Sequence, residues 1–238
     1  MIYVYLDEGA LPRSARQIVH SLRHMLQGGD DCSIRYVDHR FLTEEPAWEK
    51  DATLLVFPGG RANPYHKKLQ GLGNQRIVNF VQKGGTYLGV CAGGYYGARF
   101  VEFEKGEALE VCTELELGFF PGKAIGSAYG KGLFCYESEK GARSAKVEFF
   151  GKQGELYFNG GCFFEAPQNH SHIRSLASYT DLEGQPAAIV ECSVGQGKAI
   201  LCGVHPEYHP SGDPHQKDFG DFRRFVWEKF LSLLDRNL

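Results

Sequence analysis

Short runs of apolar residues alternate with amphipathic stretches along the first hundred residues of the chain. The runs that we interpret as strands are 2–6, 32–37, 53–57 and 86–90. Between them, apolar positions recur at helical spacing over 15–26 and over 77–81. The first of these helices has Ser14 as its candidate N-cap and ends at Gly28–Gly29. The alternation predicts a doubly wound α/β fold, with a mostly parallel sheet and helices on both faces.

The second half of the chain is richer in strands. The short strands that we expect there are 145–150, 155–158, 175–179 and 187–192. Gly195 and Gly197 mark a hairpin turn into a strand over 198–204, so we expect extra β-hairpins beside the α/β sheet. A last helix carries apolar side chains at helical spacing from Phe222 to Leu234. No linker or repeat interrupts the pattern, which predicts a single domain over 1–238.

Composition and charge narrow the classes of function. Hydrophobic residues make up 42% of the chain, charged residues 23%, and the formal net charge is −3. This balance disfavours a disordered chain, a coiled coil and a nucleic-acid-binding protein. No segment approaches the roughly 20 apolar residues that span a bilayer, and Asp7 and Glu8 follow the first run too soon for a signal peptide. The seven cysteines include no CxxC pair, so we expect a cytoplasmic protein with reduced thiols and no membrane partner.

A cysteine flanked by glycines follows the strand at 86–90. In Gly89-Val90-Cys91-Ala92-Gly93, the glycines allow a sharp turn from strand to helix, which projects Cys91 into the crevice at the carboxyl edge of the sheet. The N-terminus of the following helix favours a thiolate there. The pattern predicts a nucleophilic cysteine, although a structural cysteine at a packed turn could carry the same neighbours.

His205 and Glu207 follow the strand at 198–204 and supply partners for this cysteine. Positions i and i+2 of extended backbone face the same side, and Pro206 keeps His205 out of helical geometry. Glu207 can then hold one ring nitrogen of His205 while the other nitrogen reaches Cys91. This is the order of nucleophile, base and orienting residue in a catalytic triad. Taken alone, His205 would be interpreted as a surface or core histidine.

Backbone N–H groups beside the cysteine predict an oxyanion hole. Gly59 and Gly60 end the strand at 53–57, and together with Ala92 they would turn N–H donors toward the crevice, unless they form a plain strand-ending turn. The residues that we expect to contact a substrate are Arg61, Tyr65, Gly93, Tyr95, Tyr96, Asn159 and Gly160. The tyrosines could equally pack beside Cys91, and the segment 159–161 could equally form a hairpin turn.

A metal site is the weaker interpretation of one group of residues near the carboxyl end. His205, His209, Asp213 and His215 have a loose metal-ligand spacing. Pro206 interrupts that spacing, and no glutamate stands where an HExxH motif requires it. We therefore expect no metal, and nothing in the sequence calls for a cofactor.

The turn 58–60, the elbow 89–93 and the late His205-Pro206-Glu207 resemble, in this order, class I glutamine amidotransferases, and the resemblance spans residue 1 to about 210. It implies a flavodoxin-like sheet, with Cys91 as the nucleophile, His205 as the base and Glu207 as the residue that orients it. It also implies attack on the side-chain amide of glutamine, a γ-glutamyl thioester, and release of ammonia that a partner protein accepts.

A closer resemblance is to the amidotransferase-like domain at the N-terminus of fungal and other eukaryotic biotin–protein ligases. It rests on 58–65, 89–96 and 158–161. The chain has no Gly-Arg-Gly-Arg-type biotin loop, so we do not expect biotinylation, although a ligase is among the partner proteins that the resemblance implies. Working amidotransferases frequently carry Gln where this chain has Tyr95, and a Gly-Gly-Pro-like turn where it has Gly-Gly-Arg. The expected substrate is therefore a small amide, of which glutamine is one candidate.

Three functions follow from these observations. The first is a cysteine-dependent amidotransferase or amide hydrolase, and the second is a non-catalytic module that binds a small ligand. The third is a peptidase-like or stress-related thiol protein on a related fold. The complete set of Cys91, His205 and Glu207 favours the enzyme over the binding module. In the third class a histidine commonly follows the cysteine immediately, whereas here Ala92 does.

Overall fold

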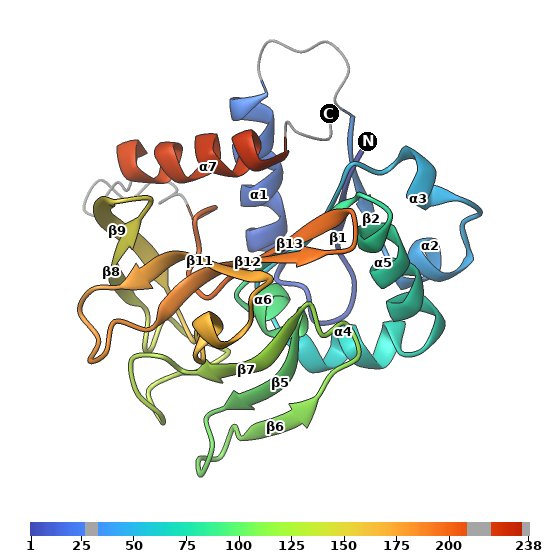
Figure 1. Cartoon of the computed structure of the whole chain (residues 1–238). Coiled ribbons are helices and arrows are strands. Elements are labelled where there is room, and N and C mark those ends of the chain that lie inside the picture. The colour runs from blue at the N-terminus through green and yellow to red at the C-terminus, as the bar shows by residue number, and fades with distance from the viewer. Residues whose placement is uncertain (27–32, 209–219, 235–238) are drawn as a thin grey trace.

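The computed structural model describes residues 1–26, 33–208 and 220–234 (Figure 1). Its elements in chain order are β1 (Ile2–Tyr5), α1 (Pro12–Met25), β2 (Ile34–Val37), α2 (His39–Glu44), α3 (Trp48–Asp51), β3 (Leu54–Phe57), α4 (Ala62–Leu69), α5 (Leu72–Gln82), β4 (Thr86–Val90), α6 (Ala92–Tyr96), β5 (Ala98–Phe103), β6 (Val111–Glu114), β7 (Phe120–Gly126), β8 (Arg143–Phe149), β9 (Lys152–Phe158), β10 (Cys162–Phe164), the 3-10 helix η1 (Pro167–Asn169), β11 (Ile173–Tyr179), β12 (Ala187–Val194), β13 (Gly197–Cys202) and α7 (Gly220–Leu234). The expected helix end at Gly28–Gly29 and the first residue of the strand expected at 32–37 lie outside the described residues.

All the strands of the described residues belong to one thirteen-stranded mixed sheet. Its main path runs β2-β1-β3-β4-β13-β12-β10-β7-β5-β6, while β11, β8 and β9 branch from β12. Neighbours from β2 to β13 pair in parallel, and most pairs beyond β13 are antiparallel. The expected flavodoxin-like, doubly wound α/β fold with added hairpins is confirmed. Because β4 and β13 are adjacent and parallel, the segments that follow their carboxyl ends meet at one edge of the sheet.

The central strands bury both of their faces. Ile2 and Val4 of β1 face a core that includes the apolar sides of α1 and α7. Tyr3 and Tyr5 of the same strand face a second core under α2 to α5. Figure 1 shows α1 and α7 on one side of the strands and α4 and α5 on the other. This two-sided burial is why these strands have apolar residues at every position instead of at alternate ones.

The first helix begins earlier than the sequence suggested. Its N-cap is Leu11, and Pro12 stands at the first helical position, where its missing N–H costs nothing. Ser14 is therefore not the N-cap that we predicted but a buried residue of the first turn. The helix expected after Cys91 is also short, since α6 ends at Tyr96 and β5 starts two residues later. Within the described ranges, no helix is long and apolar enough to cross a membrane.

Candidate active site

Cys91 occupies a strained turn between β4 and α6. Its backbone has φ +49° and ψ −102°, a conformation that L-residues rarely adopt and that tertiary packing must hold in place. A Cβ on Gly89 would lie 2.2 Å from the carbonyl oxygen of Gly93, and one on Gly93 would lie 2.1 Å from that of Phe57. The elbow therefore requires glycine at both positions. Gly93 also donates its N–H to the carbonyl oxygen of Pro58, so it packs against the end of β3. It does not line the pocket, and the prediction that it contacts a substrate was wrong.

His205 stands after β13 with Glu207 against its ring. Nδ1 of His205 lies 2.9 Å from Oε1 of Glu207, and both residues are buried. Burial alone would lower the pKa of His205, but the negative charge of Glu207, the charge of Cys91 and hydrogen bonds to both raise it well above its ordinary value. Because Nδ1 is engaged by Glu207, Nε2 is the nitrogen left for Cys91. The structure brings Cys91, His205 and Glu207 together as the sequence predicted.

Ser14 is a member of this cluster that the sequence analysis missed. Its Oγ donates a hydrogen bond of 2.7 Å to Oε1 of Glu207 and accepts one of 3.0 Å from the N–H of Gly59. It is 3% exposed. The only local signal was a small polar residue at the start of an amphipathic helix, which is equally the signal of an N-cap.

Two N–H groups remain for an oxyanion. Gly60 and Ala92 both line the pocket, and no hydrogen bond between described residues uses the N–H of either. The N–H of Gly59 is occupied by Ser14, so Gly59 is not the donor that we expected. A Cβ on Gly59 would lie 2.8 Å from Cε1 of His205, which shows that its role is to admit the imidazole. The candidate oxyanion hole therefore consists of Gly60 and Ala92.

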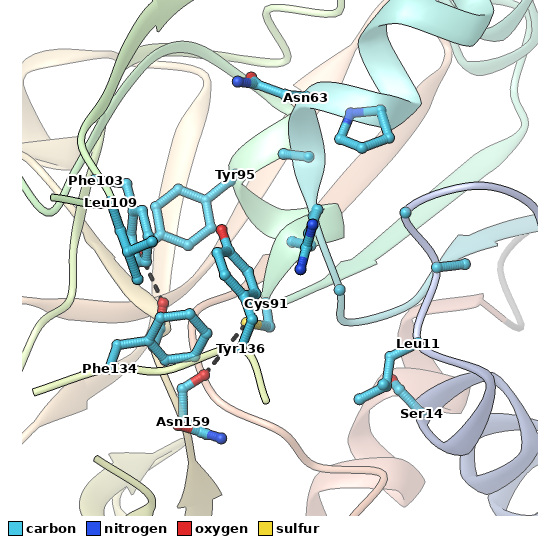
Figure 2. A pocket seen from close by; sticks show the side chains of 18 of the residues that line it. Leu11, Ser14, Asn63, Cys91, Tyr95, Phe103, Leu109, Phe134, Tyr136 and Asn159 are labelled. Carbon is cyan, nitrogen blue, oxygen red and sulfur yellow. Dashed lines mark hydrogen bonds between the residues drawn. The ribbon is translucent and has the colours of Figure 1, made fainter. Parts of the chain in front are cut away.

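A pocket of about 960 Å³ opens over Cys91. Figure 2 shows Cys91 between two groups of side chains, with Leu11 and Ser14 on one side and Tyr95 and Phe134 on the other. The Sγ of Cys91 lies 3.8 Å from the carbonyl oxygen of Asn159. Arg61, Asn159 and Gly160 line this pocket, as expected of residues that contact a substrate.

The three tyrosines separate into two groups. Tyr65 and Tyr96 are fully buried, and neither lines the pocket. The hydroxyl of Tyr65 donates to the carbonyl oxygen of Pro58, and the hydroxyl of Tyr96 donates to Asn74. The prediction that these two tyrosines contact a substrate was therefore wrong, and they pack in the core, which was the alternative interpretation. Tyr95 does line the pocket, where its hydroxyl donates to the carbonyl oxygen of Gly160 at 3.1 Å. Burial raises the pKa of all three phenols well above the ordinary value.

The loose metal-ligand spacing near the carboxyl end is only partly described. His209, Asp213 and His215 lie outside the described residues, so the structure places only His205 of that set. Among the residues that are described, no cluster of three His, Cys, Asp or Glu side chains could hold a metal ion.

A family model and a curated relative point to one family. A family model described as "Biotin-protein ligase, N terminal" matches residues 1–229. An uncharacterised protein of Chlamydia muridarum (strain MoPn / Nigg) is 41% identical over 213 residues, which are 88% of this chain and 81% of that protein. A biotin–protein ligase of Schizosaccharomyces pombe (strain 972 / ATCC 24843) is 40% identical over 190 residues. That match covers 76% of this chain but 30% of the ligase, so this chain corresponds to less than a third of the yeast protein.

Solved structures with the same fold include a glutamine amidotransferase. A crystal structure of a glutamine amidotransferase has a TM-score of 0.65 at 18% identity, covering 99% of this chain and 100% of the other. PurLQS from Thermotoga maritima has a TM-score of 0.63 at 15% identity, covering 99% and 97%. Similarity at this level of identity shows a shared fold and carries no information about substrate.

Proposed function

This chain belongs to the family of biotin–protein ligase N-terminal domains, and we propose that it is a cysteine-dependent amide hydrolase or amidotransferase. The observation that carries the proposal is the juxtaposition of Cys91 on its strained elbow, His205 with its raised pKa, and the buried carboxylate of Glu207. A binding module has no need of this combination, because each of its parts is costly to bury or to strain.

The first half of the proposed reaction forms a thioester. The thiol proton of Cys91 passes to Nε2 of His205, whose raised pKa favours the protonated ring, and Glu207 neutralises the resulting imidazolium. The thiolate attacks the carbonyl carbon of the amide. The N–H groups of Gly60 and Ala92 hold the oxyanion. The C–N bond then breaks, the nitrogen takes the proton from His205, and ammonia or an amine leaves.

The second half hydrolyses the thioester. A water molecule gives a proton to His205 as its oxygen attacks the same carbonyl carbon. When the tetrahedral intermediate collapses, the C–S bond breaks, and the thiolate of Cys91 recovers the proton from His205. The net reaction consumes one amide and one water and yields a carboxylic acid and ammonia or an amine. An amidotransferase differs only in that an acceptor takes up the released ammonia.

Mass-spectrometric labelling tests the proposal. We expect iodoacetamide near neutral pH to modify Cys91 faster than the other cysteines, and His205→Ala to lower that rate at least tenfold. Cys135→Ala is the matched control, because Cys135 is the other cysteine among the described lining residues and has no histidine partner in our scheme. A diazoketone analogue of glutamine, used in parallel, reports whether glutamine fits. If Cys91 shows no preference and no dependence on His205, the catalytic proposal is wrong and a binding module takes its place.

A further inference from the structure

One wall of the pocket is a continuous set of aromatic rings that begins beside Cys91. The rings of Tyr95 and Phe103 meet edge to face with centroids 5.7 Å apart, those of Phe103 and Phe134 at 5.5 Å, and those of Phe134 and Tyr136 at 4.8 Å. Leu109 lines the same pocket, and Figure 2 shows it with Tyr95, Phe103 and Phe134 on one side of the cysteine, while Tyr136 overlaps Cys91 in this view. Edge-to-face rings of this kind hold a stable apolar surface.

The charged side chains of the pocket are mostly exposed, and the guanidinium of Arg61 lies 4.2 Å from the ring centroid of Tyr136. Apart from His205 and Glu207, no charged residue of the described lining is buried. Three ion pairs formed by lining residues are Arg61–Glu137 at 3.7 Å, Arg13–Glu139 at 3.6 Å and Glu8–Lys68 at 3.2 Å. The ammonium and carboxylate of glutamine are attached three bonds from its amide carbon, and if they were desolvated there they would need ionic partners. The wall next to Cys91 offers apolar surface there instead.

We propose that the substrate of this site carries an apolar acyl group, an aromatic ring or a branched alkyl chain, which packs on the wall formed by Tyr95, Phe103, Leu109 and Phe134. The inference rests on the proposed amide chemistry at Cys91 and adds its substrate class. A volume of about 960 Å³ is at the large end for a small-molecule pocket, so it has room for an acyl group bulkier than that of glutamine. Tyr95 lines the same pocket as Cys91, and its backbone N–H bonds to the carbonyl oxygen of Cys91, so the wall starts beside the nucleophile.

The test uses three p-nitrophenyl esters with full-length protein. Acetate, 3-phenylpropanoate and hydrogen succinate esters share one leaving group and differ only in the acyl group. The thiolate of Cys91 forms a C–S bond, the C–O bond breaks, and p-nitrophenolate is released and measured by absorbance, while mass spectrometry locates the acyl group. Each rate is divided by the rate of the same ester with free cysteine. We expect phenylpropanoate to react at least tenfold faster than acetate, since even one well-packed methylene is worth about tenfold in an apolar pocket.

Substitutions in the wall report where the acyl group lies. Leu109→Asn should reduce the ratio of the phenylpropanoate rate to the acetate rate severalfold. Ala108→Trp should also reduce this ratio, because the larger side chain fills space in the pocket. Ala108 is exposed, so we expect this variant to fold even if Leu109→Asn does not. Leu72→Asn is the matched control, because Leu72 is 60% exposed on α5 and does not line the pocket. It should leave the ratio unchanged.

The outcomes separate this inference from the proposed function. Suppose that acylation at Cys91 depends on His205, but that the corrected rates are equal or the succinate ester is preferred. This result would overturn the inference of an apolar acyl group and would leave the proposed amide chemistry in place. A phenylpropanoate preference that persists in both Leu109→Asn and Ala108→Trp would also overturn it. If no ester acylates Cys91 in a His205-dependent way, the proposed function fails, and this inference fails with it.

Discussion

The Oγ of Ser14 lies 2.7 Å from Oε1 of Glu207 and donates a hydrogen bond to it, although the two residues are 193 positions apart in the chain. The same carboxylate oxygen faces Nδ1 of His205 at 2.9 Å. Oε2 of Glu207 has no hydrogen-bond partner in the described part of the chain. Oε1 therefore makes both contacts, and Ser14 joins the carboxylate to the turn at Gly59 through its second hydrogen bond.

Replacing Ser14 with Ala should loosen Glu207 against His205. The variant leaves the N–H of Gly59 and one lone pair of Oε1 unpaired in a buried site, which costs about 1–3 kcal/mol of unfolding free energy. We expect the rate of Cys91 alkylation to fall roughly tenfold. This is a fraction of the 10²–10⁴-fold rate enhancement that a positioned general base typically supplies. The pH profile of alkylation should also shift, which a purely structural role would not cause.

Ser21→Ala is the control for that variant. Ser21 is on the same helix, is similarly buried, and accepts a hydrogen bond of 3.3 Å from Arg223. It should lose a similar amount of stability while Cys91 keeps its alkylation rate and pH profile. Equal effects of both substitutions on alkylation would mean that Ser14 has no specific part in positioning Glu207.

Glu207→Gln should lower the pKa of His205. Burial favours the neutral ring, and the carboxylate charge of Glu207 is the largest influence that opposes it. Without that charge, we expect the pKa to fall, because only Cys91 then opposes the effect of burial. Titration of the ring nitrogens by NMR in ¹⁵N-histidine-labelled protein measures this directly. An unchanged His205 titration would show that Cys91 alone raises the pKa.

The effect of Glu207→Gln on the free energy of unfolding should depend on pH. The pKa of His205 is higher in the folded protein than in the unfolded chain, so binding of its proton stabilises the fold. This stabilisation is fully present at pH values below the pKa in the unfolded chain. It is lost as the pH rises through the pKa in the folded protein. The stability difference between wild type and Glu207→Gln should therefore be larger at about pH 6.5 than at higher pH, where it should shrink. Urea denaturation at several pH values measures it, and a difference that grows with pH would contradict the assignment.

Gly89→Ala should disrupt the elbow. The added Cβ would meet the carbonyl oxygen of Gly93 at 2.2 Å, a backbone clash that no side-chain rotation relieves. We expect a loss of about 1–3 kcal/mol or more of unfolding free energy, together with a large loss of selective Cys91 alkylation. Gly71→Ala is the comparison, because φ is +74° there but nothing lies within 4 Å of the new Cβ. It should cost about 1–2 kcal/mol while Cys91 alkylation stays normal.

Tyr96→Phe should affect stability alone. The hydroxyl of Tyr96 donates to Asn74, its ring is fully buried, and neither residue lines the pocket. Losing that bond should cost about 1 kcal/mol in a urea titration and leave the alkylation of Cys91 unchanged. Tyr36→Phe, at a residue that is 40% exposed, should change neither quantity. A slower reaction at Cys91 in Tyr96→Phe would mean that Tyr96 does act at the substrate site, as first predicted.

Local patterns were sufficient for much of the fold and for the cluster around Cys91. The apolar strands β1, β3 and β4 were predictable because burial on both faces leaves an uninterrupted run of apolar residues. Strand β5 was not, because its two consecutive exposed residues, Arg99 and Phe100, break the alternation that marks a half-buried strand. The elbow was visible because a close approach of backbone to backbone admits only glycine, which marks Gly89 and Gly93 in the sequence itself.

The sequence by itself determined which residues can do chemistry and at which strand ends they stand, since residue type and strand periodicity are local properties. Only the tertiary structure decided which hydrogen-bonding groups remain free. Ser14 occupies the N–H of Gly59, so that the candidate oxyanion hole is formed by Gly60 and Ala92. In the same way, packing directs Tyr96 into the core and Tyr95 toward the pocket. The physical reason is that contacts between residues far apart in the chain, such as Ser14 and Glu207 at 193 positions, are set by how helices and strands pack, and no short stretch of sequence encodes that.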